Sequence, residues 1–199
     1  MRYNELTFQG RNAVLEAFRS GKTIDKLFIL DGCQDGPIKS IVREAKKTDA
    51  IINYVDKERL DRLAGTGHHQ GVVAIGAAYE YAEVDDILAS AKEKGEDPFI
   101  FILDEIEDPH NLGAIIRTAN LAGAHGVIIP KRRAVGLTAT VAKTSAGAIN
   151  YTPVAKVTNI SQTIEELKKQ GLWFVCADMG GETMYNLNLK GPIGLVIGN

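Results

Sequence analysis

The residues with the clearest chemical potential lie together between Leu103 and Ala119, a stretch that reads Leu-Asp-Glu-Ile-Glu-Asp-Pro-His-Asn-Leu-Gly-Ala-Ile-Ile-Arg-Thr-Ala. Its pattern predicts the end of a buried strand, a sharp polar loop and the start of a helix. Four apolar side chains in it follow a helical spacing and form the predicted buried stripe: Leu112, Ile115, Ile116 and Ala119. Arg117 falls outside that stripe, so its guanidinium can reach the strand ends. Asn111 stands at the predicted helix start, where it acts either as a helix cap or as a group that binds substrate.

Other features of the chain imitate known kinds of site but fit them poorly. The acidic run from Asp104 to Asp108 could hold magnesium, yet loop positioning and helix capping explain it better. The segment from Gly65 to Gly71 imitates a glycine-rich nucleotide loop, but it follows a predicted helix and lacks the G-x-G-x-x-G spacing. His68 and His69 have no partner ligands at a useful spacing, and His110 has no nearby nucleophile. The sequence therefore predicts no bound metal.

The elements that position these residues alternate between helix and strand along the chain. Predicted helices cover residues 12–20, 37–47, 57–63, 84–94, 111–121, 137–146 and 161–169, and predicted strands cover residues 26–30, 51–55, 71–77, 99–103, 127–129, 152–157, 172–177 and 193–197. This order predicts an α/β fold with a parallel sheet, in which ligands bind beyond the carboxyl ends of the strands. The charged passage at residues 78–97, a linker with one helix, separates a first domain at residues 1–77 from a second at residues 98–199.

The composition is that of an ordinary soluble globular protein, with 45% hydrophobic and 24% charged residues among 199. Its net charge of −2 argues mildly against nucleic-acid binding by charge alone, so RNA binding would depend on local patches such as residues 131–133 with Lys143. The chain has no run of about 20 apolar residues and no N-terminal segment typical of a secretory signal. Cys33 and Cys176 lie far apart, which predicts no disulfide framework or zinc site and favours the reducing cytoplasm.

Four segments of the sequence resemble one known family. Residues 108–119, Asp-Pro-His-Asn-Leu-Gly-Ala-Ile-Ile-Arg-Thr-Ala, resemble the first signature motif of the SpoU/TrmH-type RNA 2′-O-ribose methyltransferases of the SPOUT superfamily. Residues 143–148 resemble the family's second block, and residues 191–199 resemble the start of its cofactor-binding motif. Residues 10–14 and 69–72 resemble the small RNA-binding domain, related to a ribosomal protein fold, of the ribosomal-RNA members. The resemblance covers nearly the whole chain and is closest to bacterial enzymes that methylate a guanosine ribose in 23S rRNA.

This resemblance implies a fold and an activity. The fold is a ribosomal-protein-like domain at residues 1–77 that binds the RNA substrate, then a parallel-sheet methyltransferase domain with a deep trefoil knot, in a homodimer whose active sites use both subunits. The activity is methyl transfer from S-adenosylmethionine to a ribose 2′-hydroxyl. Carried over residue by residue, the catalytic residues are Asn111 and Arg117, the cofactor-binding residues are Ile197, Gly198 and Asn199, and the RNA-binding residues are Arg11, Asn12, His69, Gln70, Lys143 and Ser145.

The proton affinity of arginine narrows the role of Arg117. As a general base it would have to lose its proton, and a free arginine has a pKa of about 12.5–13.8, so deprotonation near neutral pH costs roughly 8 kcal/mol. A neighbouring RNA phosphate raises that cost because it favours the charged form. We therefore expect Arg117 to bind phosphate and to stabilise the developing alkoxide, while Asn111 orients the hydroxyl.

The family's cofactor motif would continue beyond Asn199 into a glutamate and glycines, followed by a last strand, loop and helix. Those residues complete the knot, much of the cofactor pocket and much of the dimer interface. The sequence therefore predicts a domain whose C-terminal part is absent, and weak cofactor binding for a chain that truly ends here. Three alternative functions follow: methylation of transfer RNA, RNA binding without catalysis, and small-molecule binding by a doubly wound domain.

Overall fold

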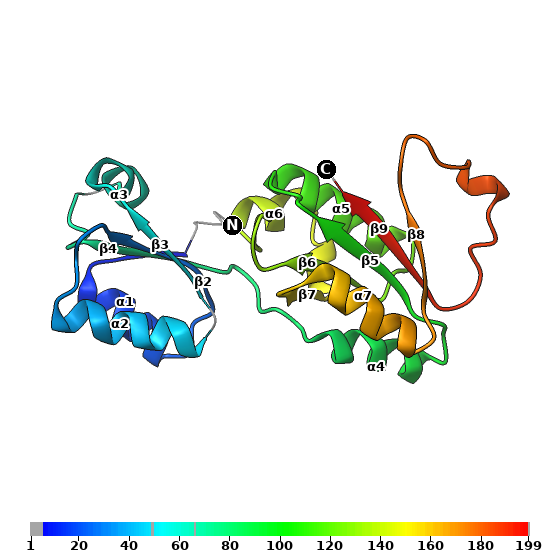
Figure 1. The fold of residues 1–199 in the computed structure, drawn as a ribbon, viewed down its shortest axis with the longest axis horizontal. Helices are drawn as coiled ribbons and strands as arrows, with labels where there is room; N and C mark the ends of the chain where they lie inside the picture. The colour runs from blue at the N-terminus through cyan, green and yellow to red at the C-terminus, as the bar shows by residue number, and fades with distance from the viewer. Residues whose placement is uncertain (1–5, 49, 66, 199) are drawn as a thin grey trace. The chain divides into compact units, whose positions relative to one another are not determined.

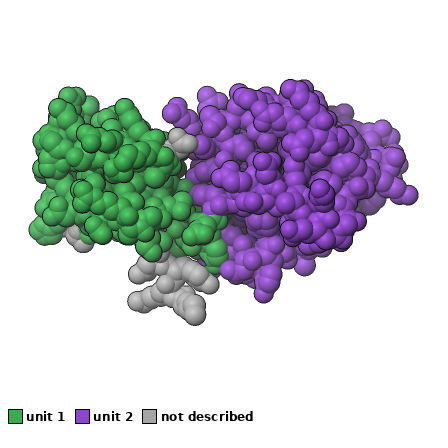
Figure 2. All heavy atoms as spheres, turned by 90° about the horizontal axis from the view of Figure 1, so that it is seen from below, with its two compact units in different colours: residues 1–80, 136–139 green, residues 81–135, 140–199 purple. Residues whose placement is uncertain are grey.

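A computed structural model describes residues 6–48, 50–65 and 67–198. The chain divides into two compact units (Figure 2), of which unit 1 contains residues 1–80 and 136–139 and unit 2 contains residues 81–135 and 140–199. The helix of the charged passage, α4 (Val84–Lys94), belongs to unit 2. None of the described helices has the length and apolar character needed to cross a membrane.

Unit 1 is a four-stranded sheet with helices on both faces (Figure 1). Its elements in chain order are β1 (Leu6–Gln9), α1 (Arg11–Arg19), β2 (Ile24–Leu30), α2 (Gly36–Lys47), β3 (Ile51–Val55), α3 (Lys57–Ala64) and β4 (Val72–Gly76). The strand order is β1-β4-β2-β3, in which β2 and β3 are parallel and β4 runs antiparallel to β1 and β2. Unit 1 is thus a mixed sheet, a pairing that the order of elements along the chain does not reveal.

Alternation along the strands decides which helices cover which face of this sheet. On β2, Leu27 and Ile29 pack against the buried side chains of α1 and α2, whereas Phe28 packs against Leu60 of α3. The strand register aligns the ends of β1 and β2 with the start of β4. Gln9 at the end of β1 and Phe28 near the end of β2 both pair with Val73, the second residue of β4. The starts of α1 and α2 and the turn before β4 therefore lie at the same edge of the sheet.

Unit 2 is built on a five-stranded sheet. After α4 its elements are β5 (Phe99–Asp104), α5 (Pro109–Leu121), β6 (Gly126–Pro130), α6 (Ala139–Thr144), η1 (Ala148–Asn150), β7 (Val154–Val157), α7 (Ile160–Lys169), β8 (Trp173–Cys176), η2 (Met184–Asn186) and β9 (Ile193–Gly198). The strand order is β7-β6-β5-β9-β8, and every neighbouring pair is parallel. The predicted parallel α/β sheet is confirmed here, and its last strand lies between β5 and β8 (Figure 1).

Helices cover both faces of this second sheet. Ile87 of α4 and Leu167 of α7 pack on one face, against Ile100 and Ile102 of β5 and Ile128 of β6. The sheet separates these two helices from α5 and α6 (Figure 1). A strand covered on both faces must be apolar at every position, which is the physical reason for the uninterrupted run Phe-Ile-Phe-Ile-Leu in β5.

Candidate functional site

The carboxyl edge of the unit 2 sheet brings the first and the last motifs of the domain together. In the pairing of β5 with β9, Asp104 lies opposite Gly198 and Leu103 lies opposite Ile197. The chain runs outward from β5 through β6 to β7, then crosses to β8 and returns to β9. The strand order thus changes direction beside β5, and ligands of open α/β sheets bind at such a point, beyond the strand ends.

Helix α5 starts at this edge and carries the two predicted catalytic residues. Asp108 caps the helix, since its carboxylate accepts a hydrogen bond of 2.8 Å from the main-chain N–H of His110, and Pro109 occupies the first turn. The alternative in which Asn111 serves as the helix cap is therefore wrong. Asn111 and Arg117 are both exposed, and within the described part of the chain neither side chain has a hydrogen-bond or ion-pair partner. Both side chains are thus available to a substrate.

The predicted buried stripe of α5 is largely confirmed. Leu112, Ile116 and Ala119 are fully buried, whereas Ile115 is only partly buried. Gly113 is buried too, and a methyl group added to it would overlap the side chain of Thr144 at the end of α6. The absence of a side chain at Gly113 lets α5 approach α6 closely, which fixes the direction in which α5 leaves the strand edge.

The end of β9 has the properties expected of a backbone that contacts a cofactor. Gly198 is exposed, and a methyl group added to it would meet no described atom within 4 Å. Ile197 is half-buried beside it, and Asn199 lies outside the described residues. Asp104, the residue paired with Gly198, is exposed. Its carboxylate would attract a positively charged ligand such as a sulfonium to this strand end. The residues present therefore fit S-adenosylmethionine.

Two strained loop residues meet next to this edge, one after β5 and one after β6. Glu105 has φ 55° and Arg133 has φ 56°, both in the left-handed region that non-glycine residues rarely adopt. Their side chains form an ion pair of 2.8 Å, and the hydrogen bond and charge of Glu105 raise the pKa of Arg133. The main-chain N–H of Val135 also donates to the carbonyl of Ile106 at 3.0 Å. The sequence showed an acidic and a basic run but gave no sign that they pair, because the contact depends on β5 and β6 being neighbours.

The second block contributes one of its two predicted RNA-binding residues to the surface. Lys143 is exposed on α6. Ser145 is completely buried, and its hydroxyl donates to the carbonyl of Ala142 at 3.0 Å. The Ser145 side chain therefore has no solvent-facing surface and its donor is used within the chain, so its predicted contact with RNA stays a prediction.

In unit 1, three of the four predicted RNA-binding residues come together. Arg11 and Asn12 at the start of α1 and Gln70 in the turn before β4 line the same hollow. His69 is buried, with Nδ1 accepting from the N–H of Gly71 at 3.0 Å and Nε2 lying 2.9 Å from a carboxylate oxygen of Asp61. Both nitrogens of the buried His69 ring are occupied within unit 1, so its predicted role in RNA binding stays a prediction. His69 holds the turn that presents Gln70.

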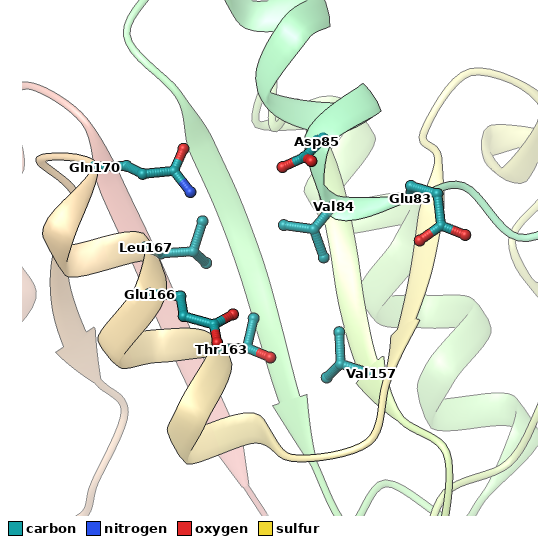
Figure 3. A pocket seen from close by; sticks show the side chains of 8 residues that line it. All are labelled: Glu83, Val84, Asp85, Val157, Thr163, Glu166, Leu167 and Gln170. Atoms are coloured by element: carbon teal, nitrogen blue, oxygen red, sulfur yellow. The ribbon is translucent and has the colours of Figure 1, made fainter.

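A hollow of about 240 Å³ in unit 2 lies between the start of α4 and α7. Figure 3 shows the side chains of the two helices facing each other across it, with Val84 and Leu167 between the carboxylates of Glu83, Asp85 and Glu166. None of the predicted site residues lines it. Its acidic rim would repel RNA phosphates. Among the described residues, no group of three or more histidine, cysteine, aspartate or glutamate side chains is placed to hold a metal ion.

Comparison with known protein families assigns both parts of the chain. Residues 98–199 match the model of the "SpoU rRNA Methylase family", and residues 9–82 match the model for "RNA 2'-O ribose methyltransferase substrate binding". The chain belongs to the SpoU/TrmH family of RNA methyltransferases. The predicted family and the predicted arrangement, a substrate-binding part followed by a parallel-sheet SpoU methyltransferase part, are thereby confirmed.

Several curated SpoU/TrmH proteins are similar to nearly the whole chain. A putative TrmH family tRNA/rRNA methyltransferase, YacO, of Bacillus subtilis is 51% identical over 191 residues, which are 96% of this chain and 76% of that protein. A putative TrmH family tRNA/rRNA methyltransferase of Staphylococcus haemolyticus is 46% identical over 196 residues, covering 98% of this chain and 78% of the relative.

Solved SpoU structures share the fold. The SpoU methyltransferase AviRb from Streptomyces viridochromogenes aligns with a TM-score of 0.54 and 22% identity, over 100% of this chain and 73% of that chain. The same enzyme in complex with the cofactor AdoMet aligns with a TM-score of 0.53 and 21% identity, over 100% and 74%. At this identity the likeness concerns the fold alone.

Proposed function

We propose that this chain transfers a methyl group from S-adenosylmethionine to the ribose 2′-hydroxyl of a guanosine in 23S rRNA. The observation that carries the proposal is the pairing of β5 with β9, which sets Gly198 opposite Asp104 at the strand edge from which α5 presents Asn111 and Arg117. Membership of the SpoU family and the AdoMet complex of AviRb support the choice of cofactor. In this proposal residues 1–77 bind the RNA, residues 98–199 form the methyltransferase domain, and the knot implied by the family stays a prediction.

The chain's own residues would act mainly by position and charge. When bound, S-adenosylmethionine supplies an electrophilic methyl group on a sulfonium. That methyl group would pass to the ribose oxygen, whose hydroxyl proton would leave to solvent. Arg117 would neutralise the negative charge that develops on the oxygen and would bind the adjacent phosphate. Asn111 would hold the hydroxyl in line with the methyl group, and such alignment accounts for much of the rate enhancement in bimolecular transfers.

A homodimer belongs to the same proposal and has support from the surface of unit 2. Leu121 at the end of α5 and Tyr151 after η1 are 82% and 81% exposed. They are the chain neighbours of Asn120 and Thr152, whose side chains are hydrogen-bonded at 3.0 Å, so the two segments that carry them lie side by side. Exposed apolar side chains are often buried when proteins associate, and we infer that these two contribute to the interface. A cytoplasmic location also stays part of the proposal, supported by two free cysteines.

Transfer RNA is the second candidate substrate, and the names of the relatives favour neither nucleic acid, since they read tRNA/rRNA methyltransferase. The deciding experiment incubates the protein with methyl-labelled S-adenosylmethionine and, in parallel, with unmodified 23S rRNA or total transfer RNA. The RNA is then digested, and 2′-O-methylguanosine is measured by mass spectrometry. Label in 23S rRNA at guanosine alone is the expected result.

Each other result of this experiment changes the proposal in a definite way. Label in transfer RNA alone replaces the substrate but keeps the reaction. RNA binding without transfer of label, in a sample that is folded by circular dichroism, leaves the non-catalytic RNA-binding module as the function of this polypeptide. Absence of both binding and transfer overturns the proposal.

A further inference from the structure

A second hollow, of about 530 Å³, opens on unit 1 at the edge where α1, α2 and the turn before β4 begin. Its volume lies in the range of about 300–1,000 Å³ that is typical of small-molecule sites. The side chains that line it are of two kinds. Arg11, Asn12 and Gln70 are polar, and Leu30, Cys33 and Pro37 form an apolar part.

The polar groups are held in place by contacts within unit 1. The main-chain N–H of Arg11 donates to Gln70 Oε1 and its Nε donates to the Gln70 carbonyl, each at 3.1 Å. The Arg11 guanidinium also pairs with Asp35, the residue that caps α2. Gln70 itself has φ 51°, a strained value that the buried ring of His69 helps to hold. The Gln70 amide nitrogen therefore stays available as a donor, because its oxygen is the atom bound to Arg11.

This arrangement suits a nucleobase better than a phosphate. The charge of Arg11 is already neutralised by Asp35, and the same carboxylate would repel a phosphate at the rim. The apolar part offers a surface to a flat ring, and the amides of Asn12 and Gln70 can donate to and accept from the edge of a base. Proteins that read RNA do so mainly on unstacked bases bound in this way.

We propose that the hollow receives one unstacked nucleobase of the RNA substrate, at a position separate from the methylated nucleotide. The inference rests on the proposed function, because it takes RNA to be the substrate. Unit 1 would then select the RNA by the identity of a base and not only by the charge of the backbone. The hollow lies wholly within unit 1, so the binding of this base needs no contribution from unit 2.

The two cysteines of the chain supply a direct test. Cys33 lines the hollow and is partly buried, whereas Cys176 is exposed at the end of β8. In the full chain carrying Cys176→Ser, the alkylation rate of Cys33 by N-ethylmaleimide is measured with and without 23S rRNA. At an RNA concentration about ten times the Kd, occupancy of the hollow should slow alkylation about tenfold. Sodium polyphosphate at the same phosphate concentration, which carries charge but no base, should leave the rate unchanged.

A matched pair of variants on α1 provides the second readout. Asn12→Ala should weaken RNA binding by about 5- to 30-fold with an unchanged dependence on salt, because no phosphate contact is lost. Glu16→Ala, on the same helix but outside the hollow, should bind as the parent does.

The outcomes separate this inference from the proposed function. Unprotected Cys33 in a complex that fluorescence anisotropy shows to be saturated overturns the nucleobase site and leaves the methyltransferase proposal standing. Equal protection by polyphosphate makes the hollow a phosphate site and overturns the inference as well. Absence of any RNA binding, together with absence of methyl transfer, overturns both the nucleobase site and the proposed methyltransferase function.

Discussion

The positions of Asn111 and Arg117 on α5 suggest different tasks for the two side chains. They are six residues apart in one helix. At about 100° and 1.5 Å per residue, they point about 120° apart and are separated by about 9 Å along the helix axis. Side chains on a helix lean toward its N-terminus, so the long Arg117 side chain can reach back toward the strand edge where Asn111 already lies. In the proposed function, Asn111 would orient the reacting hydroxyl and Arg117 would bind charge arriving from the solvent side.

Removal of the Arg117 charge should therefore slow the reaction without unfolding the protein. We expect Arg117→Ala to lower kcat by about 10²- to 10³-fold, as for other lost groups that stabilise a developing oxyanion. Arg117→Lys should recover little, because an ammonium lacks the planar fork that binds phosphate at two oxygens. Single-turnover methyl transfer measures both variants, and Arg43→Lys in unit 1 is the control. Recovery of the Arg117→Ala rate at high pH would contradict the electrostatic role and favour a base.

Gly198 should matter for the cofactor and not for the fold. Because a side chain at this position meets no described atom, Gly198→Val should leave the thermal midpoint unchanged. The added side chain would occupy the space of the cofactor, so we expect affinity for S-adenosylmethionine to fall by about 10- to 100-fold, equivalent to about 1–3 kcal/mol. Isothermal calorimetry measures the affinity, with Gly180→Ala, another open position, as the control. Unchanged affinity in Gly198→Val would place the cofactor elsewhere.

At the scale of elements, the loops after β5 and β6 form one braced unit. The ion pair between Glu105 and Arg133 is exposed, so its direct contribution to stability is small. The ion pair instead helps to hold Glu105 and Arg133 in left-handed backbone conformations, which non-glycine residues rarely adopt. Since α5 begins only four residues after Glu105, this brace helps to set where Asn111 is presented.

The contact between α5 and α6 should be the element-scale feature most sensitive to size. Gly113→Ala adds a methyl group that overlaps Thr144, and the overpacking cost of about 1–3 kcal/mol should exceed the gain of about 1 kcal/mol in helix propensity. We expect a lower free energy of unfolding in urea and a displaced α5 with reduced methyl transfer. Gly36→Ala is the matched control, because Gly36 is also helical but has open space around it. Equal stability changes in the two variants would show that α5 and α6 are not tightly packed.

At the scale of the whole molecule, the distribution of charge removes an apparent conflict with RNA binding. Residues 78–97 hold seven acidic and two basic side chains, a net charge of −5 (2 − 7). This passage is more negative than the whole chain, whose net charge is −2. Residues 1–77 hold twelve basic and ten acidic side chains, and residues 98–199 hold nine basic and eight acidic. Residues 1–77 and residues 98–199 are therefore each slightly basic. The excess of negative charge belongs to α4 and its flanks, including the rim of the acidic hollow in unit 2.

The exposed side chains of Leu121 and Tyr151 should control self-association if the proposed homodimer forms through them. Burial of an exposed leucine contributes about 1.5–3 kcal/mol to an interface, so Leu121→Glu should raise the dimer dissociation constant by tenfold or more. Sedimentation equilibrium measures this constant. Tyr54→Glu, at an exposed apolar residue of unit 1, should leave it unchanged. A parent protein that stays monomeric at high concentration would contradict the homodimer proposal for this polypeptide.

The sequence by itself determined the elements and the chemistry of the motifs, because both depend on residues close together in the chain. The bounds of β3 and α4 match their predictions, and those of most other elements shift by one or two residues, since period-2 and period-3.6 patterns are local. The strand β1 was missed because a four-residue edge strand carries too short a pattern to read. The exposure of Arg117 followed from its place outside the buried stripe of α5.

Only the tertiary structure decided which segments meet. It alone showed that β9 pairs with β5, that Glu105 meets Arg133, and that one hollow gathers residues from both ends of unit 1. It also showed that His69 and Ser145 are buried, although both stand in motif segments. The physical reason is the same in each case. Strand pairing and burial depend on contacts between distant parts of the chain, and no local spacing encodes which side chains those contacts will cover.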